Sequence, residues 1–134
     1  MNIFLSYKQT GLDKAVLKKE LESIKKIIEN TNNNVYIYFF EELIDESPNN
    51  LMKLFKEKIK ESDLVIWLVN YTEKSEWELI ELWLAKALDK RILLLVDNNV
   101  KSNYSLIYWL TTDIIYYDDI SELKILLTKY LKWK

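Results

Sequence analysis

A carboxylate lies in the middle of an otherwise apolar helical stripe. Counting from Trp77, the residues four, seven, eight and eleven positions later are Glu81, Leu84, Ala85 and Leu88. Residues with this spacing share one helix face, and the apolar face of a helix packs against a sheet. Because a charge left unpaired on such a face costs several kcal/mol, Glu81 needs a reason to be there. Either it reaches solvent or a lysine near the helix end, or it opens into a functional cleft.

The helix that carries Glu81 has a recognisable start. Ser75 and Glu78 have the spacing of a capping box, in which the serine begins the helix and the glutamate reaches back to its backbone. We therefore assign Glu78 a structural role and expect a helix over residues 76–88. Trp77 lies one turn before Glu81, where it is either a core aromatic or a surface on which a ligand stacks.

The residue types that are absent narrow the chemistry. The 134 residues include no cysteine and no histidine, which excludes disulfides, thiolate nucleophiles, Cys-type zinc sites and a histidine general base. Catalysis must then rest on Asp, Glu, Lys, Tyr, Ser or Thr, and we expect no metal site. Arg91 is the only arginine and Gly11 the only glycine, so neither an arginine clamp nor a glycine-rich phosphate cradle is expected.

Charge and hydropathy narrow the choice of partners. The net charge is −2 and the sequence pI is 5.3, with lysines spread among acids, which argues against nucleic acid as a partner. No apolar run approaches the ~18 residues of a membrane span. The first residues read as a strand rather than a signal peptide, so we expect a cytoplasmic protein without membrane contact.

Strand-like and helix-like segments alternate along the chain. Five apolar or β-branched segments predict strands, at residues 3–6, 35–40, 64–69, 92–96 and 114–117. Amphipathic stripes predict helices between and after them, and residues 41–50, with Pro48, are expected to form a long loop. Right-handed crossovers then predict one α/β domain over residues 1–134. It is expected to be a flavodoxin-like three-layer sandwich with a five-stranded parallel sheet of order 2-1-3-4-5.

The predicted topology also indicates where a ligand would bind. In such sheets the ligand lies outside the carboxyl ends of the strands, near the switch between the first and third strands. Ser6, Tyr7 and Lys8 end the first strand and either contact phosphates or an adenine ring or serve as ordinary loop residues. Phe39 and Phe40 end the second strand, at the same edge of the sheet.

Taken together, these segments resemble a TIR (Toll/interleukin-1 receptor) domain. The TIR pattern is an apolar strand, an Asn-Tyr-like turn and then Ser-x-Trp-x-x-x-Glu-Leu, and residues 63–82 are similar to it throughout. Residues 3–7, which end in Ser-Tyr, are similar to the family's first strand, as are residues 90–92 and the Trp109 region to its later segments. The resemblance covers essentially the whole chain in order.

This resemblance implies an activity. Many TIR domains cleave NAD+ between nicotinamide and ribose, and the glutamate at the position of Glu81 is their catalytic residue. Nicotinamide is already cationic and leaves without a general acid, while one carboxylate can stabilise the ribosyl oxocarbenium ion. The implied protein is an NAD+ nucleosidase or cyclase, with NAD+ as substrate and no other cofactor, that makes an ADP-ribose-type signal in antiviral defence. The residues expected to bind this substrate are Ser6, Tyr7, Lys8, Phe39, Phe40 and Trp77.

Two other functions stay open. Residues 41–50 lack the glycine usual in TIR domains, some of which are adaptors that only self-associate. Nucleoside 2-deoxyribosyltransferases and related nucleotide N-glycosidases share this sheet and the helical glutamate, and residues 85–88 resemble a stretch of theirs. Leu82 and Trp83 stand where those enzymes have small residues, so this interpretation ranks second and the adaptor third. The TIR resemblance further implies self-association and an activating or effector protein as partner.

Overall fold

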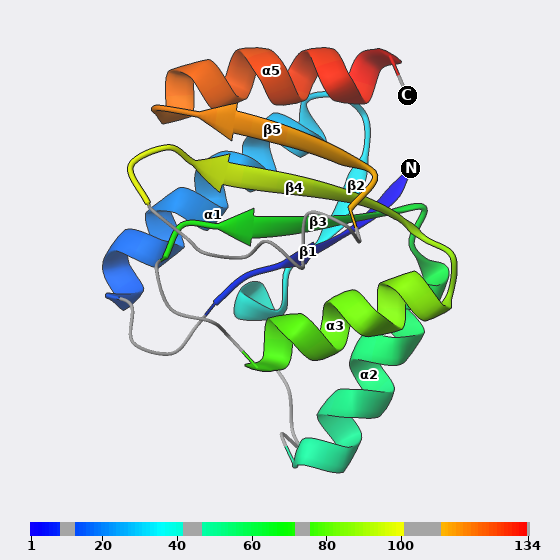
Figure 1. Cartoon of the computed structure of the whole chain (residues 1–134). Coiled ribbons are helices and arrows are strands. Elements are labelled where there is room, and N and C mark those ends of the chain that lie inside the picture. Colours follow the sequence, from blue (N-terminus) through cyan, green and yellow to red (C-terminus); the bar gives the residue numbers. More distant parts are fainter. Residues whose placement is uncertain (9–12, 42–46, 72–75, 101–110, 134) are drawn as a thin grey trace.

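The described residues form five strands and four α-helices. The computed structural model describes residues 1–8, 13–41, 47–71, 76–100 and 111–133 (Figure 1). The strands are β1 (Asn2–Ser6), β2 (Asn34–Tyr36), β3 (Leu64–Val69), β4 (Arg91–Asp97) and β5 (Asp113–Tyr117). The helices are α1 (Lys14–Glu29), α2 (Pro48–Glu61), α3 (Glu76–Ala87) and α5 (Ile120–Trp133), with a short 3-10 helix, η1 (Tyr38–Phe40), after β2.

The strands form one parallel sheet in the order β2-β1-β3-β4-β5, which confirms the predicted topology. In the centre Leu5 lies beside Ile66, and Ile66 lies beside Leu93. Because all the strands run the same way, their carboxyl ends meet at one edge of the sheet (Figure 1). The chain order of the strands reverses between β1 and β3. The topological switch point, next to which the sequence predicts a ligand, is therefore present.

Helices cover both faces of this sheet. Alternate residues of β3 point to opposite sides: Leu64, Ile66 and Leu68 pack with α1 and α5, while Val65 and Trp67 pack with α2 and α3. This is why the strand is apolar without interruption. Figure 1 shows the two helix layers on either side of the sheet, which confirms the three-layer sandwich. Within the described part of the chain, no helix is both long and apolar enough to span a membrane.

Two predictions of local structure were wrong. The second strand ends at Tyr36 rather than at residue 40, because β2 pairs with β1 only through residues 34–36 and the chain then turns into η1. The loop predicted over residues 41–50 is too long, since Pro48 begins α2. Proline suits the first position of a helix because its missing N–H would have no helical partner there. Gly11, Ser75 and Trp109 lie outside the described residues.

Candidate active site

Glu81 is buried against the sheet, as its spacing predicted. Its side chain lies in α3 and is only 7% exposed, so the escape to solvent that the sequence left open does not occur. Burial raises the pKa of this carboxyl from 4.5 to about 8, while the nearby Ser6 hydroxyl lowers it. Glu81 is therefore mostly protonated at neutral pH in the free protein, and a cationic partner would be needed to ionise it fully.

Glu78 is a second buried carboxyl at the same place, and the sequence analysis gave it only a capping role. Its side chain is 0% exposed, and the Tyr71 hydroxyl donates a hydrogen bond to its Oε1. Burial raises the pKa of Glu78 well above the ordinary value, Tyr71 and Lys8 lower it, and Glu81 raises it. The predicted capping partner, Ser75, lies outside the described residues.

The phase of the helical stripe explains why Glu78 was missed. The buried positions of α3 are Glu78, Glu81, Leu82 and Ala85, which follow one another at helical spacing. A stripe counted from Trp77 places the large indole toward the sheet, and it is out of phase with this buried face. Trp77 is instead 39% exposed and packs edge-to-face on Phe55 of α2, with 6.0 Å between ring centroids. Its role in stacking a ligand stays a prediction.

The end of β1 brings its three candidate residues to this edge of the sheet. Ser6, Tyr7 and Lys8 are all buried. Ser6 affects the ionisation of Glu81, and the Lys8 ammonium lies 5.1 Å from the centre of the Tyr71 ring. Tyr7 packs in the apolar cluster on the α1 side of the sheet. Because side chains alternate along a strand, Ser6 and Lys8 face the opposite side, toward α3.

Aromatic residues after β2 pack with Tyr7 on the α1 side of this edge. Phe39 packs edge-to-face on Tyr7, with 6.2 Å between the ring centroids, and Phe40 packs on Phe39, with 5.2 Å between the ring centroids. Sequence reasoning did not single out Tyr36, whose pKa burial raises to about 12 with Glu41, Tyr38 and Glu81 adding to the effect. Its position as the last residue of β2, at the carboxyl edge, was the signal that could have found it.

Two tyrosine hydroxyls beside Glu81 are buried without a hydrogen-bond partner among the described residues. They belong to Tyr7 and Tyr36, and the negative charge of Glu81 contributes to the raised pKa of each. A buried hydroxyl without a partner costs about 1–3 kcal/mol, so such groups usually have a function or a missing ligand.

Nothing in the described chain suggests a metal centre at this place. No group of three or more Asp, Glu, His or Cys residues is arranged there to hold an ion. The tyrosine hydroxyls, the Lys8 ammonium and the two carboxyls suit a sugar phosphate better than a cation, because they combine hydroxyl donors with one positive charge.

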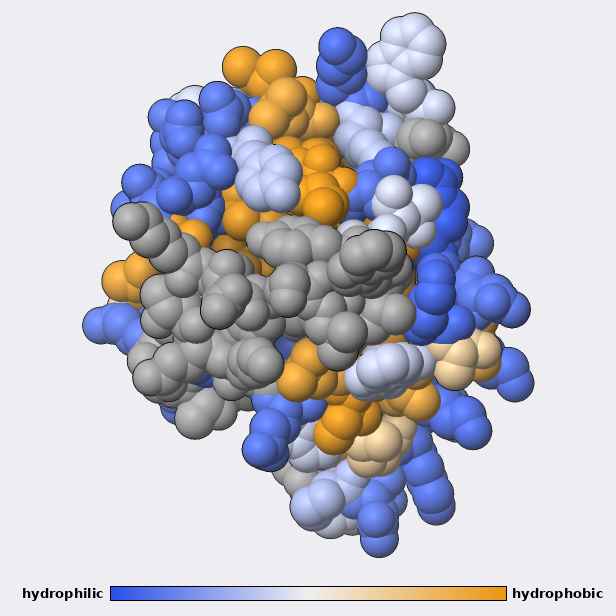
Figure 2. Space-filling view, viewed as in Figure 1, coloured by the Kyte–Doolittle hydropathy of each residue, from blue (hydrophilic) through white to orange (hydrophobic). Residues whose placement is uncertain are grey.

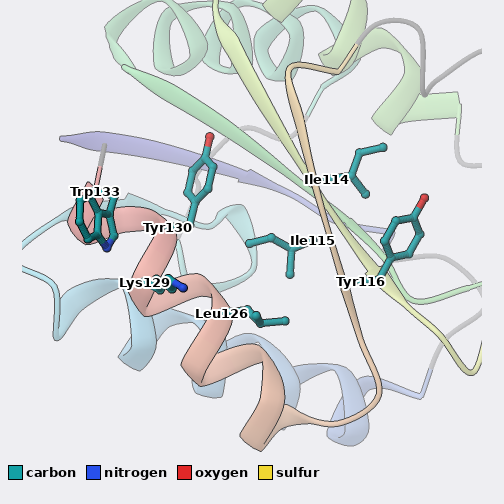
Figure 3. A pocket seen from close by; sticks show the side chains of 7 residues that line it. All are labelled: Ile114, Ile115, Tyr116, Leu126, Lys129, Tyr130 and Trp133. Atoms are coloured by element: carbon teal, nitrogen blue, oxygen red, sulfur yellow. The ribbon is translucent and has the colours of Figure 1, made fainter.

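A surface groove lies on another side of the molecule. It measures about 470 Å³ and runs between β5 and α5, lined by Ile114, Ile115, Tyr116, Leu126, Lys129, Tyr130 and Trp133 (Figure 3). Elsewhere, Ile80 and Trp83 of α3 are exposed, and Figure 2 shows hydrophobic surface in the region of this helix. Neither area contains the buried carboxyls. Both are apolar enough for the predicted self-association, which stays a prediction.

Comparison with known proteins gives structural neighbours but no family. No protein-family model matches the chain, and no curated protein is significantly similar to it. The CMP N-glycosidase BcmB of Clostridium botulinum is 29% identical, with 97% of this chain and 99% of that chain covered and a TM-score of 0.75. A 2-deoxyribosyltransferase of Bacillus psychrosaccharolyticus is 16% identical over 92% of this chain and 90% of that one, with a TM-score of 0.62.

A third neighbour adds to the fold alone. A conserved protein of Enterococcus faecalis is 11% identical over 98% of this chain and 97% of that chain, with a TM-score of 0.73. The chain shares the α/β fold of these neighbours. These neighbours favour the second interpretation of the sequence, the deoxyribosyltransferase and nucleotide N-glycosidase class, over the TIR domain.

Proposed function

We propose that this protein is a nucleotide N-glycosidase that hydrolyses the bond between C1′ of the sugar and the base of a nucleoside 5′-monophosphate such as CMP. The observation that carries the proposal is Glu81, a carboxyl buried at the carboxyl ends of the strands with a pKa of about 8. The likeness to a CMP N-glycosidase over nearly the full length of both chains supports the choice of substrate.

Glu81 would stabilise the positive charge that develops at C1′. As the base departs, the ribose becomes an oxocarbenium-like cation, and an ionised carboxylate beside it lowers the free energy of that state. This task falls to the ionised form of Glu81, which the developing positive charge favours. The hydroxyls of Tyr7 and Tyr36 would hold the ribose hydroxyls, which gives these two buried groups the partners that they lack among the described residues.

The second carboxyl favours a nucleotide over NAD+. Nicotinamide leaves as a neutral molecule without help, but cytosine leaves as an anion unless it is protonated as the bond breaks. An enzyme for cytosine therefore benefits from a proton donor beside its charge-stabilising carboxylate, as in other glycosidases with two carboxyl groups. Glu78 is a buried carboxyl whose pKa lies well above its ordinary value, and it lies one helical turn from Glu81.

Lys8 would bind the 5′-phosphate. Among Ser6, Tyr7 and Lys8 it carries the positive charge. Its side chain is buried, and its ammonium lies over the Tyr71 ring. A lysine ammonium is a suitable point charge for a phosphate where no arginine fork is available. The rings of Phe39 and Phe40 would border the sugar or the base next to Tyr7.

The test is release of free base, measured by liquid chromatography after incubation of the purified protein with CMP. We expect cytosine and ribose 5-phosphate from the native protein and a loss of at least ~1,000-fold with Glu81→Gln, since the charge on the carboxylate is then gone. Glu76→Gln is the matched control, because Glu76 is an exposed glutamate in the first turn of the same helix.

Other substrates separate the competing functions. NAD+, deoxycytidine and a deoxynucleoside with an added free base would be incubated in parallel. Nicotinamide release from NAD+ without attack on CMP would support the TIR interpretation and contradict the proposal. Exchange of bases between deoxynucleosides would instead indicate a transferase. If the folded protein attacked none of these substrates, the result would contradict the proposal and favour the non-catalytic adaptor.

A further inference from the structure

The buried carboxyl of Glu78 contacts a tyrosine at the carboxyl edge of the sheet. It lies in the first turn of α3, fully buried, three residues before Glu81. Its Oε1 accepts a hydrogen bond from the hydroxyl of Tyr71, which lies just after β3 at the carboxyl edge of the sheet. The ring of Tyr71 also lies 5.1 Å from the Lys8 ammonium, so Tyr71 contacts both Glu78 and the end of β1.

We propose that Glu78 stores the proton which the departing base takes up, and that the Tyr71 hydroxyl delivers it. The inference rests on the proposed function, because it concerns the leaving group of that same reaction. It assigns Glu78 as a positioning residue that acts through Tyr71, and Tyr71 as the group that touches the base. Glu81 keeps a separate task at C1′.

The electrostatics of the pair support this division. The charged or titratable groups that act on Glu78 are Tyr71 from the end of β3, Lys8 from the end of β1 and Glu81 from α3 itself. The pKa of Glu81 rises to about 8, whereas that of Glu78 is raised by burial and further raised by a charge on Glu81. An ionised Glu81 therefore favours the protonated form of Glu78. Two carboxyls whose environments separate their pKa values are typical of an acid and a charge stabiliser that work together.

The step balances as a hydrolysis. The bond between C1′ and the base nitrogen breaks, and its electron pair stays with the base. The phenol proton of Tyr71 passes to the base while the proton of Glu78 passes to the phenol oxygen, since a hydroxyl can turn from donating to one group to donating to another. Water adds to C1′, and the proton that it releases returns to Glu78. The net products are free base and ribose 5-phosphate.

The experiment compares two leaving groups. CMP needs a proton on its base, whereas 4-nitrophenyl β-D-ribofuranoside 5-phosphate releases a stable anion and needs none. With Glu78→Gln and with Tyr71→Phe, we expect kcat for CMP to fall by about 100-fold or more and kcat for the nitrophenyl substrate to fall far less, because only the first requires general acid catalysis. The native protein should also lose CMP activity at alkaline pH as Glu78 ionises, and both variants should lack this limb of the pH profile.

Different failures have different meanings. If the native protein releases no base from CMP, the proposed function itself fails. If the native protein is active and both variants slow the two substrates equally, or neither variant slows CMP, then Glu78 and Tyr71 have only a structural role and the inference is overturned. Tyr71→Phe keeps the ring under Lys8, so it provides the test should Glu78→Gln fail to fold.

Discussion

The side-chain amide of Asn70 donates a hydrogen bond to Oε2 of Glu20 across 2.8 Å, and so ties the residue before Tyr71 to α1. The Tyr117 hydroxyl at the end of β5 donates to the other oxygen of Glu20 across 3.3 Å. Burial raises the pKa of Glu20, these two donors lower it, and Asp97 raises it. One half-buried carboxyl thus holds together three segments at the carboxyl edge of the sheet.

The contact between Asn70 and Glu20 predicts that a carboxyl in place of the amide destabilises the fold. Asn70→Asp would set an acid against Glu20 and remove the donor, so we expect the free energy of unfolding to fall by about 1–3 kcal/mol at neutral pH. Because the repulsion holds the pKa of the acids above their unfolded values, stability should recover as pH falls and they take up protons. Urea unfolding at neutral and acid pH measures this. The double variant Asn70→Asp, Glu20→Gln exchanges the two groups and should recover most of the loss at neutral pH; no recovery would mean that the contact does not carry the energy.

Glu81→Gln should make the folded protein more stable at alkaline pH while it removes activity. The pKa of Glu81 is 4.5 ordinarily and about 8 here, so the folded protein binds its proton more tightly than the unfolded chain does. Stability is therefore lost as pH rises from the lower to the higher value, by at most about 5 kcal/mol in total. Glutamine has no proton to lose. We expect the variant and the native protein to be equally stable near the lower pKa, and the variant to be more stable above the higher one.

Thermal unfolding across this pH range measures the difference. Glu76→Gln is again the control, because Glu76 is exposed and should leave the pH dependence of stability unchanged. A native protein whose stability did not fall between the two pKa values would show that Glu81 is not desolvated as described.

The fold could be predicted from sequence because the strongest local signals agree with one another. The uninterrupted apolar residues of β3 and β4 require cover on both faces, and only alternation with helices gives it. The end of β2 was less predictable, because β2 is an edge strand and its length depends on its pairing with β1. The aromatic residues after Tyr36 have high strand propensity, but the pairing with β1 stops at Tyr36, opposite Phe4, and the chain turns into η1.

The site was only partly predictable. Glu81 could be found because a charge in an apolar stripe is a local anomaly in the sequence. Glu78 could not be recognised, since its capping-box spacing gave it a sufficient local explanation and its contact with Tyr71 depends on how α3 packs against the sheet. Tyr36 likewise comes close to Glu81 only through the pairing of β2 with β1.

Ser6→Ala should move the pH dependence of activity. The Ser6 hydroxyl lowers the pKa of Glu81, so its removal raises that pKa further. If the ionised form of Glu81 is needed for catalysis, the acid limb of kcat/KM for CMP should shift to higher pH, while activity well above that limb changes little. Ser23→Ala, on the exposed side of α1, is a control for the loss of a serine hydroxyl. An unshifted limb would separate Ser6 from the ionisation of Glu81.

Tyr130→Phe should change stability without changing catalysis. The Tyr130 hydroxyl donates to Asp113 Oδ2 across 2.7 Å, and Arg91 contacts the same oxygen across 3.1 Å. This cluster joins α5 to the amino ends of β4 and β5, at the edge of the sheet away from Glu81. The variant loses this hydrogen bond and the one that Arg91 donates to the Tyr130 hydroxyl across 3.3 Å, which should lower the free energy of unfolding by about 1–2 kcal/mol. Urea unfolding and kcat/KM for CMP test the two halves of the prediction, and a large fall in kcat/KM would show coupling across the sheet.

Lys8→Gln should weaken binding of the nucleotide through its phosphate. If the Lys8 ammonium contacts the 5′-phosphate, loss of a charge-assisted hydrogen bond of about 1.5–3 kcal/mol should raise KM for CMP by roughly ten- to a hundredfold. Cytidine, which has no phosphate, should be used equally by the native protein and the variant. Lys18→Gln is the control, because Lys18 is an exposed lysine of α1. A loss that is equal for CMP and cytidine would instead assign Lys8 to holding Tyr71 and Glu78 in place, since its ammonium lies 5.1 Å from the Tyr71 ring and acts on the pKa of Glu78.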